Sequence, residues 1–226
     1  MPAARRPHRH PQRQAADVAG RLSGRDLSRP RRGRYGEGQR DLGFPRVLDH
    51  RILGVLTRLE AEEARPPGIA VGPTTARFLF SVCAPQTDCE VLEIGAGRGY
   101  ATVWLAAAVR HLGGRVLSLE RDHACLADWR RNIAEAGLEE TAELVEGDAR
   151  ETLPMIDDVF DVVFLNAANE QYEELVQLAR GKLEPGALVI AADALRAYSE
   201  ARQADPTLSS LTVPLDRGLE MSVVLR

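Results

Sequence analysis

Short apolar runs alternate with segments of helical spacing from about residue 90 onward. Each run is a nearly continuous stretch of apolar side chains, which is typical of a parallel strand covered on both faces. Repeated strand and helix units of this kind predict an α/β fold with a doubly wound, mostly parallel sheet. The predicted strands cover about residues 90–94, 115–119, 142–146, 160–165 and 187–191.

Helix signals separate these strands. Asp122 is a suitable N-cap and Gly137 a suitable C′ residue for one helix between them. Further helices are predicted from Gly99 to Gly113 and near residues 150–156, 170–181 and 194–203. Two late β runs, 211–215 and 220–225, are joined by Asp216-Arg217-Gly218, which predicts an antiparallel hairpin at the sheet edge. The expected sheet therefore has seven strands.

An amphipathic helix is predicted ahead of the first strand, between about residues 44 and 64. Arg65-Pro66-Pro67-Gly68 ends this helix, and Pro73 can start another one. The apolar face of the first helix is expected to contain seven residues at helical spacing, Val47, Leu48, Ile52, Leu53, Val55, Leu56 and Leu59.

The first 42 residues differ in composition from residues 43–226, which are expected to form one domain. Residues 1–40 hold eleven arginines against three acidic residues, so a net charge of −4 for the whole chain leaves about −12 on the rest. This basic arm has few large apolar residues, and its ordering entropy could not be offset by burial. We therefore expect a disordered, solvated extension, which we favour over an arm that contacts nucleic acid.

Composition indicates a cytoplasmic protein. No run approaches the roughly 18 uninterrupted apolar residues that a membrane span needs, and no signal-peptide segment is recognisable, so no membrane association is expected. The chain has three cysteines without CxxC spacing, Cys83, Cys89 and Cys125. Reduced thiols are therefore favoured over a disulfide or a zinc site.

The strand at 90–94 runs into three alternate glycines, Gly95, Gly97 and Gly99, and then into helix-compatible sequence. Glycine allows a positive φ and a close approach of a ligand, and the first turn of the next helix presents unpaired N–H groups. This strand, turn and helix predict a site that holds a nucleoside cofactor. Glu120 ends the second strand, at a suitable distance along the chain to bind a ribose diol.

Polar residues that follow neighbouring parallel strands should meet at one edge of the sheet. The glycine turn, Glu120, Asp148 and Asn166 each follow a different predicted strand. A nicotinamide dehydrogenase uses a similar glycine turn and is the competing interpretation. Its G-x-G-x-x-G pattern needs a glycine where this chain has Tyr100, so the sequence does not favour it.

From about residue 44 to its end the chain resembles a class I S-adenosylmethionine-dependent methyltransferase, and within that class the small O-methyltransferases of the catechol and caffeoyl-CoA type. The resemblance implies a Rossmann-like methyltransferase fold, the cofactor S-adenosylmethionine and a small-molecule acceptor. It rests on motifs that occur in order along the chain, 91–100, 119–120, 147–154, 160–165, 183–190 and 213–219.

The resemblance also implies roles for individual residues. The turn residues Gly95, Ala96, Gly97 and Gly99 would let the backbone approach the methionine half of the cofactor. Glu93 would lie behind this turn, and Glu120 would bind both ribose hydroxyls. Asp148 and Ala149 would face the adenine, and Arg121 would lie at the rim of the pocket.

The positions that bind magnesium in the related metal-dependent enzymes differ here. They correspond to Asn166, Asp193 and Ala194, and Asn169 stands where those enzymes have a lysine base. A small hard cation prefers several charged oxygen ligands, so the sequence predicts no metal site and a metal-independent or weakly metal-dependent transferase. Asp193 and Asn166 are the candidate catalytic residues, with Asp193 as the base.

Two alternatives stay open from the sequence. Residues 68–73 and 119–121 also resemble protein isoaspartate methyltransferases, which methylate a carboxyl group. Alternatively, the changed catalytic positions could mark a protein that binds the cofactor without transferring a methyl group. The sequence names no acceptor, and it leaves a homodimer open.

Overall fold

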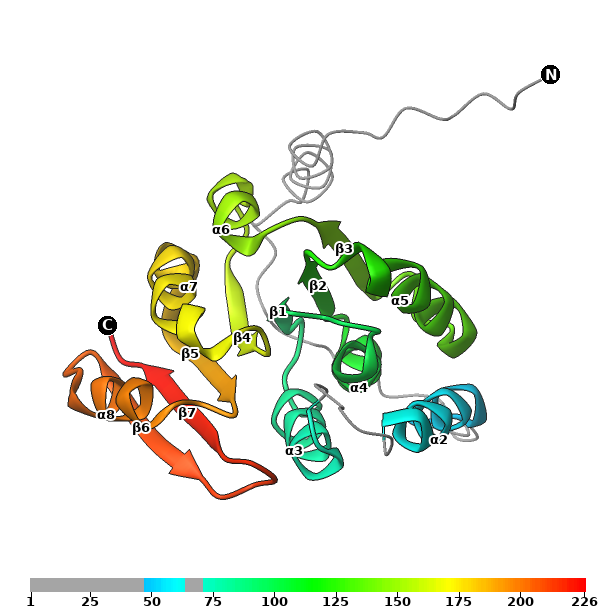
Figure 1. Ribbon diagram of the computed structural model, residues 1–226, viewed down its shortest axis with the longest axis horizontal. Coiled ribbons are helices and arrows are strands. Elements are labelled where there is room, and N and C mark those ends of the chain that lie inside the picture. The colour runs from blue at the N-terminus through cyan, green and yellow to red at the C-terminus, as the bar shows by residue number, and fades with distance from the viewer. Residues whose placement is uncertain (1–46, 64–70) are drawn as a thin grey trace, which may run out of the picture.

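A computed structural model describes residues 47–63 and 71–226 of the chain. The predicted arm over residues 1–42 lies outside these ranges, and so does the predicted helix end at Arg65-Pro66-Pro67-Gly68. Within the described part the predicted α/β architecture is confirmed, with one seven-stranded sheet in the order β3-β2-β1-β4-β5-β7-β6 (Figure 1). The strands are β1 (Glu90–Ile94), β2 (Arg115–Glu120), β3 (Ala142–Glu146), β4 (Phe160–Leu165), β5 (Leu183–Ala192), β6 (Leu208–Val213) and β7 (Leu219–Val224).

The first five strands pair in parallel, and β7 is antiparallel to both β5 and β6. Helices α2 (His50–Glu63), α3 (Pro73–Cys83), α4 (Tyr100–Val109) and α5 (His123–Ala136) share a core with one face of the sheet. Helices α6 (Ala149–Thr152), α7 (Tyr172–Ala179) and α8 (Arg196–Ala204) share a core with the other face. Side chains of β1 alternate accordingly, with Val91 in the first core and Leu92 in the second.

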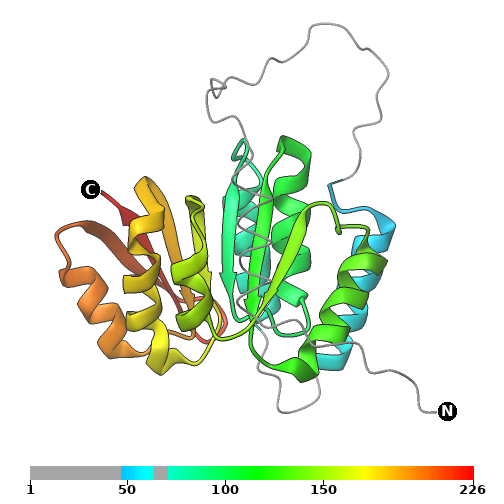
Figure 2. The same cartoon turned by 90° about the horizontal axis from the view of Figure 1, so that it is seen from above.

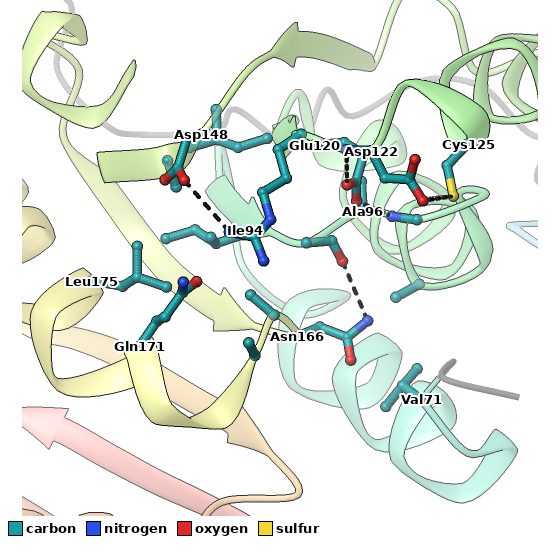
Figure 3. Close-up of a pocket in the computed structure, with 18 of the residues that line it drawn as sticks. Val71, Ile94, Ala96, Glu120, Asp122, Cys125, Asp148, Asn166, Gln171 and Leu175 are labelled. Carbon is teal, nitrogen blue, oxygen red and sulfur yellow. Dashed lines mark hydrogen bonds and ion pairs between the residues drawn. The ribbon is translucent and has the colours of Figure 1, made fainter. Parts of the chain in front are cut away.

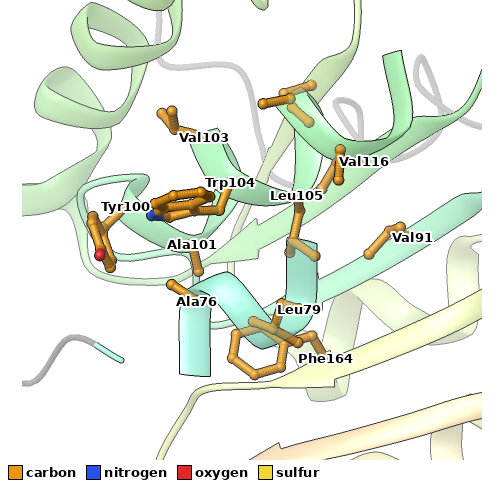
Figure 4. Close-up of a cluster of buried hydrophobic side chains, with 14 of the residues drawn as sticks. Ala76, Leu79, Val91, Tyr100, Ala101, Val103, Trp104, Leu105, Val116 and Phe164 are labelled. Carbon is orange, nitrogen blue, oxygen red and sulfur yellow. The ribbon is translucent and has the colours of Figure 1, made fainter. Parts of the chain in front are cut away.

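Helix α4 is buried on all sides. Each of its ten residues is buried, and none of them is charged. Helix α3 packs beside α4, and α2 and α5 also contact it. Figure 4 shows this packing, with Trp104 and Leu105 of α4 near Ala76 and Leu79 of α3. A helix that is covered on every side has apolar residues on every side, as α4 does. Packing against several neighbours therefore fixes the position of α4.

Helix α7 and helix α8 lie side by side on the opposite face (Figure 2). The rings of Tyr172 and Tyr198 meet edge to face with centroids 5.7 Å apart. Arg202, which is 5% exposed, pairs with Glu173 at 2.8 Å. These contacts fix α8 against α7.

Several predicted boundaries are wrong for identifiable reasons. Helix α2 begins at His50 because Asp49 Oδ1 accepts hydrogen bonds from the N–H groups of Arg51 and Ile52. Leu53, predicted on the apolar face of α2, is 47% exposed. Strand β5 begins at Leu183, four residues before the predicted start.

The early start of β5 follows from its pairing with β4. The pairing of β4 with β5 shifts between Phe160 and Val162, which lets Pro185 and Gly186 lie inside β5. The antiparallel hairpin is confirmed, but β6 ends at Val213, so its loop is longer than the predicted three-residue turn.

The hairpin loop also caps helix α3. Gly72 precedes this helix and offers no side-chain cap, and Asp216 Oδ2 instead accepts a hydrogen bond of 2.7 Å from the N–H of Thr75. A Cβ atom on Gly72 would overlap the Asp216 carboxylate. The glycine therefore allows a loop near the end of the chain to close the first turn of a helix near its beginning.

Candidate active site

A cavity of about 820 Å³ opens at the carboxyl ends of four neighbouring strands, β3, β2, β1 and β4 (Figure 3). This volume is in the range of pockets that bind cofactors and small molecules. The backbone and side chains that line it come mainly from the segments directly after these strands, namely 94–98, 119–122, 147–149 and 166–171.

The turn after β1 is built on three glycines with positive φ. The φ angles are 92° at Gly95, 52° at Gly97 and 91° at Gly99. The N–H groups of Gly95 and Ala96 donate to the carbonyl oxygen of Leu119 at 2.9 and 3.2 Å, which holds the turn against β2. A Cβ atom on Gly97 would have nothing within 4 Å, whereas one on Gly99 would lie 3.1 Å from Trp129. Gly97 therefore leaves open space, and Gly99 lets the start of α4 pack closely against Trp129 of α5.

Glu120 joins the end of β2 to the glycine turn. Its carboxylate accepts hydrogen bonds from the N–H of Gly97 at 2.6 Å and from the N–H of Asp122 at 2.7 Å. The side chain lines the cavity although the residue is 8% exposed. A carboxylate has about four acceptor sites, so two of them remain for the hydroxyl groups of a ligand.

Asp148 follows β3 and caps the short helix α6 through a hydrogen bond from the N–H of Arg150. Its carboxylate also pairs with the guanidinium groups of Arg150 at 2.6 Å and of Arg121 at 3.4 Å. The hydrogen bond from Arg150 is the main reason why the pKa of Asp148 lies well below its usual range. Asp148 is therefore a stable anion at this end of the cavity.

Helix α2 is fastened to the glycine turn by ionic contacts. Arg98 of the turn pairs with Glu62 of α2 and, at 3.0 Å, with Asp128 of α5. The hydroxyl of Tyr100 donates to Glu60 at 2.7 Å. The hydrogen bond from Arg98 lowers the pKa of Glu62. Glu62 itself lines the cavity, so α2 contributes to its wall.

Glu93 lies behind the glycine turn and is fully buried. One carboxyl oxygen accepts hydrogen bonds from the hydroxyl groups of Thr102 at 2.5 Å and Ser118 at 2.6 Å. Thr102 in turn accepts a bond of 3.0 Å from the indole of Trp129. Burial raises the pKa of Glu93 to about 7, although the two hydroxyl bonds oppose this shift.

Amide side chains lie at the end of β4. The side-chain N–H of Asn166 donates to the carbonyl oxygen of Gly95 at 3.3 Å, and that of Asn169 donates to the carbonyl oxygen of Asp193 at 2.6 Å. Asp193, directly after β5, has a positive φ of 51° and pairs with Arg217 of the hairpin loop. Asp193 is not among the residues that line the cavity.

Comparisons with known proteins agree with this geometry. A family model described as a methyltransferase domain matches residues 92–194. A catechol O-methyltransferase of Niastella koreensis is 34% identical over 59% of this chain and 62% of its own length. A catechol O-methyltransferase of Mycobacterium tuberculosis is 32% identical over 74% of this chain and 80% of its own length. The chain belongs to the S-adenosylmethionine-dependent O-methyltransferases.

The fold of this O-methyltransferase also occurs in solved structures. The O-methyltransferase TomG from Streptomyces achromogenes, solved in complex with S-adenosylmethionine, superposes with a TM-score of 0.67 and 22% identity. The superposition covers 79% of this chain and 91% of that one. Among residues 47–63 and 71–226, no helix of this O-methyltransferase is long and apolar enough to cross a membrane.

The residues predicted as departures from a magnesium site do not fit a hard cation. Asp193 is the one carboxylate among these positions, and it is paired with the guanidinium of Arg217, while Asn166 and Asn169 carry no charge. Ala194 offers no side-chain ligand. Over the described residues, no group of three or more His, Cys, Asp or Glu side chains has an arrangement that could hold a metal.

Most predicted site residues of this O-methyltransferase line the same cavity: Gly95, Ala96, Gly97, Glu120, Arg121, Asp148, Ala149 and Asn166. Glu93, Gly99 and Asp193 do not line it. Their placement depends on packing and ion pairing between distant segments.

Several lining residues were not predicted from the sequence, among them Cys125, Gln171 and Leu175. They lie one helical turn or more beyond the strand ends. A position directly after a strand end therefore gives no signal for them, although Cys125 lies in the first turn of α5 and could be found from that helix start.

Proposed function

We propose that this O-methyltransferase methylates a hydroxyl group of a small phenolic acceptor of the catechol type, without a tightly bound metal. The acceptor class is inferred from the names of the two bacterial relatives. The observation that carries the proposal is the cavity at four neighbouring strand ends, which combines an open glycine turn with two carboxylates, Glu120 and Asp148.

In this proposal the cofactor lies across the strand ends. The turn residues Gly95, Ala96 and Gly97 approach its methionine half, and a Cβ atom at position 97 would project into the open space that the cofactor is proposed to fill. Glu120 accepts hydrogen bonds from the ribose hydroxyls. Asp148, Ala149 and Arg121 surround the adenine end. Glu93 and Gly99 support the turn from behind without lining the cavity.

The bound cofactor supplies an electrophilic methyl group on a positively charged sulfur. The protein has to hold the acceptor oxygen in line with it, exclude water and let the acceptor proton leave. A phenol loses that proton more easily than an alcohol does. Asn166 at the end of β4 is the proposed positioning group, because its amide oxygen is not used in the bond to Gly95.

Asp193 is the proposed base, and its ion pair with Arg217 sets a condition for proton transfer to its carboxylate. Asp193 lies outside the cavity lining and its carboxylate faces Arg217, so it can accept a proton only from an acceptor that extends beyond this lining, and only when the guanidinium turns aside or shares the carboxylate. Arg217 is the more exposed partner, with 57% of its side chain accessible, so it has room to turn aside.

The test is a methyl-transfer assay with labelled S-adenosylmethionine and matched acceptors. We expect a labelled methyl ether from catechol, none from an isoaspartyl peptide, and unchanged rates in EDTA. The variant Glu120→Ala should lose cofactor binding, while Glu174→Ala on α7, outside the cavity lining, serves as a control. Loss of activity in EDTA that magnesium restores would contradict the metal-independent reaction, and label in the peptide would contradict the acceptor class.

We further expect residues 43–226 to form the catalytic domain, residues 1–42 to form a solvated arm, and the protein to work in the cytoplasm. A homodimer is compatible with this proposal, and the mass of the protein in solution tests it.

A further inference from the structure

Glu93 combines an ionisable side chain with complete burial in the middle of the sheet. It lies on β1 between Ser118 of β2 and Phe164 of β4, just before the glycine turn. One of its carboxyl oxygens has no hydrogen-bond partner. Within the described part of the chain, no arginine, lysine or histidine pairs with it.

The elements packed around Glu93 offer it hydroxyl groups and one anion. Helix α4 contains no charged residue and contributes Thr102, and α5 contributes Trp129 through its bond to Thr102. Strand β2 contributes Ser118 and, two residues later, Glu120. The charge of Glu120 raises the pKa of Glu93 further.

An ionised carboxyl group in this place lacks both water and a counter-ion. Such a group stays protonated up to a higher pH than an exposed one, because burial penalises the charged form. A positive charge that arrives next to Glu120 would lower this penalty. The cavity lined by Glu120 is the place where a positively charged ligand can arrive.

We propose that binding of the sulfonium form of the cofactor releases a proton from the buried Glu93 carboxyl group to the solvent. The proposal rests on the cofactor site described above. S-adenosylmethionine carries a positive sulfur, whereas the product S-adenosylhomocysteine has a neutral thioether of nearly the same shape. The protein therefore distinguishes substrate cofactor from product cofactor through a residue outside the cavity wall, and the carboxylate formed is stabilised while the positive charge is present.

The sign of the pH effect follows from this release. Because the bound state holds fewer protons, the affinity for S-adenosylmethionine relative to S-adenosylhomocysteine should rise with pH. With a pKa of Glu93 of about 7 in the free protein, the ratio should rise by up to about tenfold between pH 6 and pH 8. Above that range it should level off.

Calorimetry at pH 7 in two buffers of different ionisation enthalpy, phosphate and Tris, measures the protons released. We expect up to about half a proton per S-adenosylmethionine bound, and clearly fewer with S-adenosylhomocysteine. The variant Glu93→Gln should remove this excess. Glu220→Gln is the matched control, since Glu220 is 1% exposed on β7 and does not line the cavity.

Infrared difference spectra of the unmodified protein provide a readout that needs no variant. The carbonyl stretch of a protonated carboxylic acid should disappear on addition of S-adenosylmethionine and persist with S-adenosylhomocysteine. Equal proton release for the two ligands, or release that survives in Glu93→Gln, would overturn the proposal. Absence of binding by either ligand would instead overturn the proposed function.

Discussion

The two glycines at positions 95 and 97 should respond differently to the same substitution by alanine. A Cβ atom on Gly95 would overlap the carbonyl oxygen of Asn166 and lie 2.7 Å from its carbonyl carbon, at a φ of +92°. A Cβ atom on Gly97 would have nothing within 4 Å, at a φ of +52° that alanine can adopt at modest cost. Gly95→Ala therefore disturbs the contact between β1 and β4, and Gly97→Ala fills open space beside the cavity.

The expected sizes follow from these contacts. Backbone strain and overpacking together make Gly95→Ala cost about 3–4 kcal/mol of unfolding free energy, whereas Gly97→Ala should cost about 1 kcal/mol. For a domain of this size, a difference of about 2.5 kcal/mol corresponds to roughly 5–10 °C in Tm. The order should be reversed for binding, because Gly97→Ala places a methyl group where the cofactor is proposed to approach the turn.

Thermal unfolding without ligand and calorimetry with S-adenosylhomocysteine at a temperature where both variants are folded would measure the two effects. We expect Gly95→Ala to lose stability, and Gly97→Ala to lose at least tenfold in affinity while remaining close to the wild type in Tm. Equal Tm values for the two variants, or unchanged affinity in Gly97→Ala, would refute this account of the turn.

Three other substitutions test separate contacts. Glu93→Gln should make the unfolding free energy less dependent on pH. With a pKa of about 7 for Glu93 in the folded protein, the wild type should lose about 3 kcal/mol of unfolding free energy as pH rises from 4.5 to 7. Urea unfolding at pH 5 and pH 8 should show this loss only in the wild type. Asp216→Ala should remove the cap of α3, cost about 1 kcal/mol of unfolding free energy and lower the Tm accordingly. Asp157→Ala, at an exposed position, is the control and should leave the Tm unchanged. Arg98→Met should weaken cofactor binding about threefold to tenfold, because its two ion pairs hold the turn, whereas Arg131→Met should bind normally in the same titration.

The central part of the fold could be predicted from the sequence because its strands are short apolar runs between turn residues. Strands β1, β3 and β4 have the predicted ends, and Asp122 and Gly137 bound α5 as expected. The prediction was less successful at β5, where Pro185 and Gly186 look like a turn but lie in a bulged strand. Pairing with a neighbour decides that case, and pairing is not visible in a local window.

For the candidate site, the positions of the residues could be predicted from the sequence. Residues directly after parallel strands converge because the strands share a direction, which explains why Glu120, Asp148 and Asn166 line one cavity. The state of each side chain was not predictable. The burial of Glu93 depends on α4 and β2, and the ion pair of Asp193 depends on Arg217, 24 positions further along the chain.

The cap that Asp216 provides to helix α3 has a consequence for the order of folding during synthesis. The N–H of Thr75 leaves the ribosome about 140 residues before its partner does, so α3 cannot have its native first turn while the chain is still growing. Val71, which lines the cavity, directly precedes Gly72 at this start of α3. This side of the cavity should therefore reach its final form only after the last hairpin has been made, although the glycine turn and its neighbouring strands are synthesised much earlier.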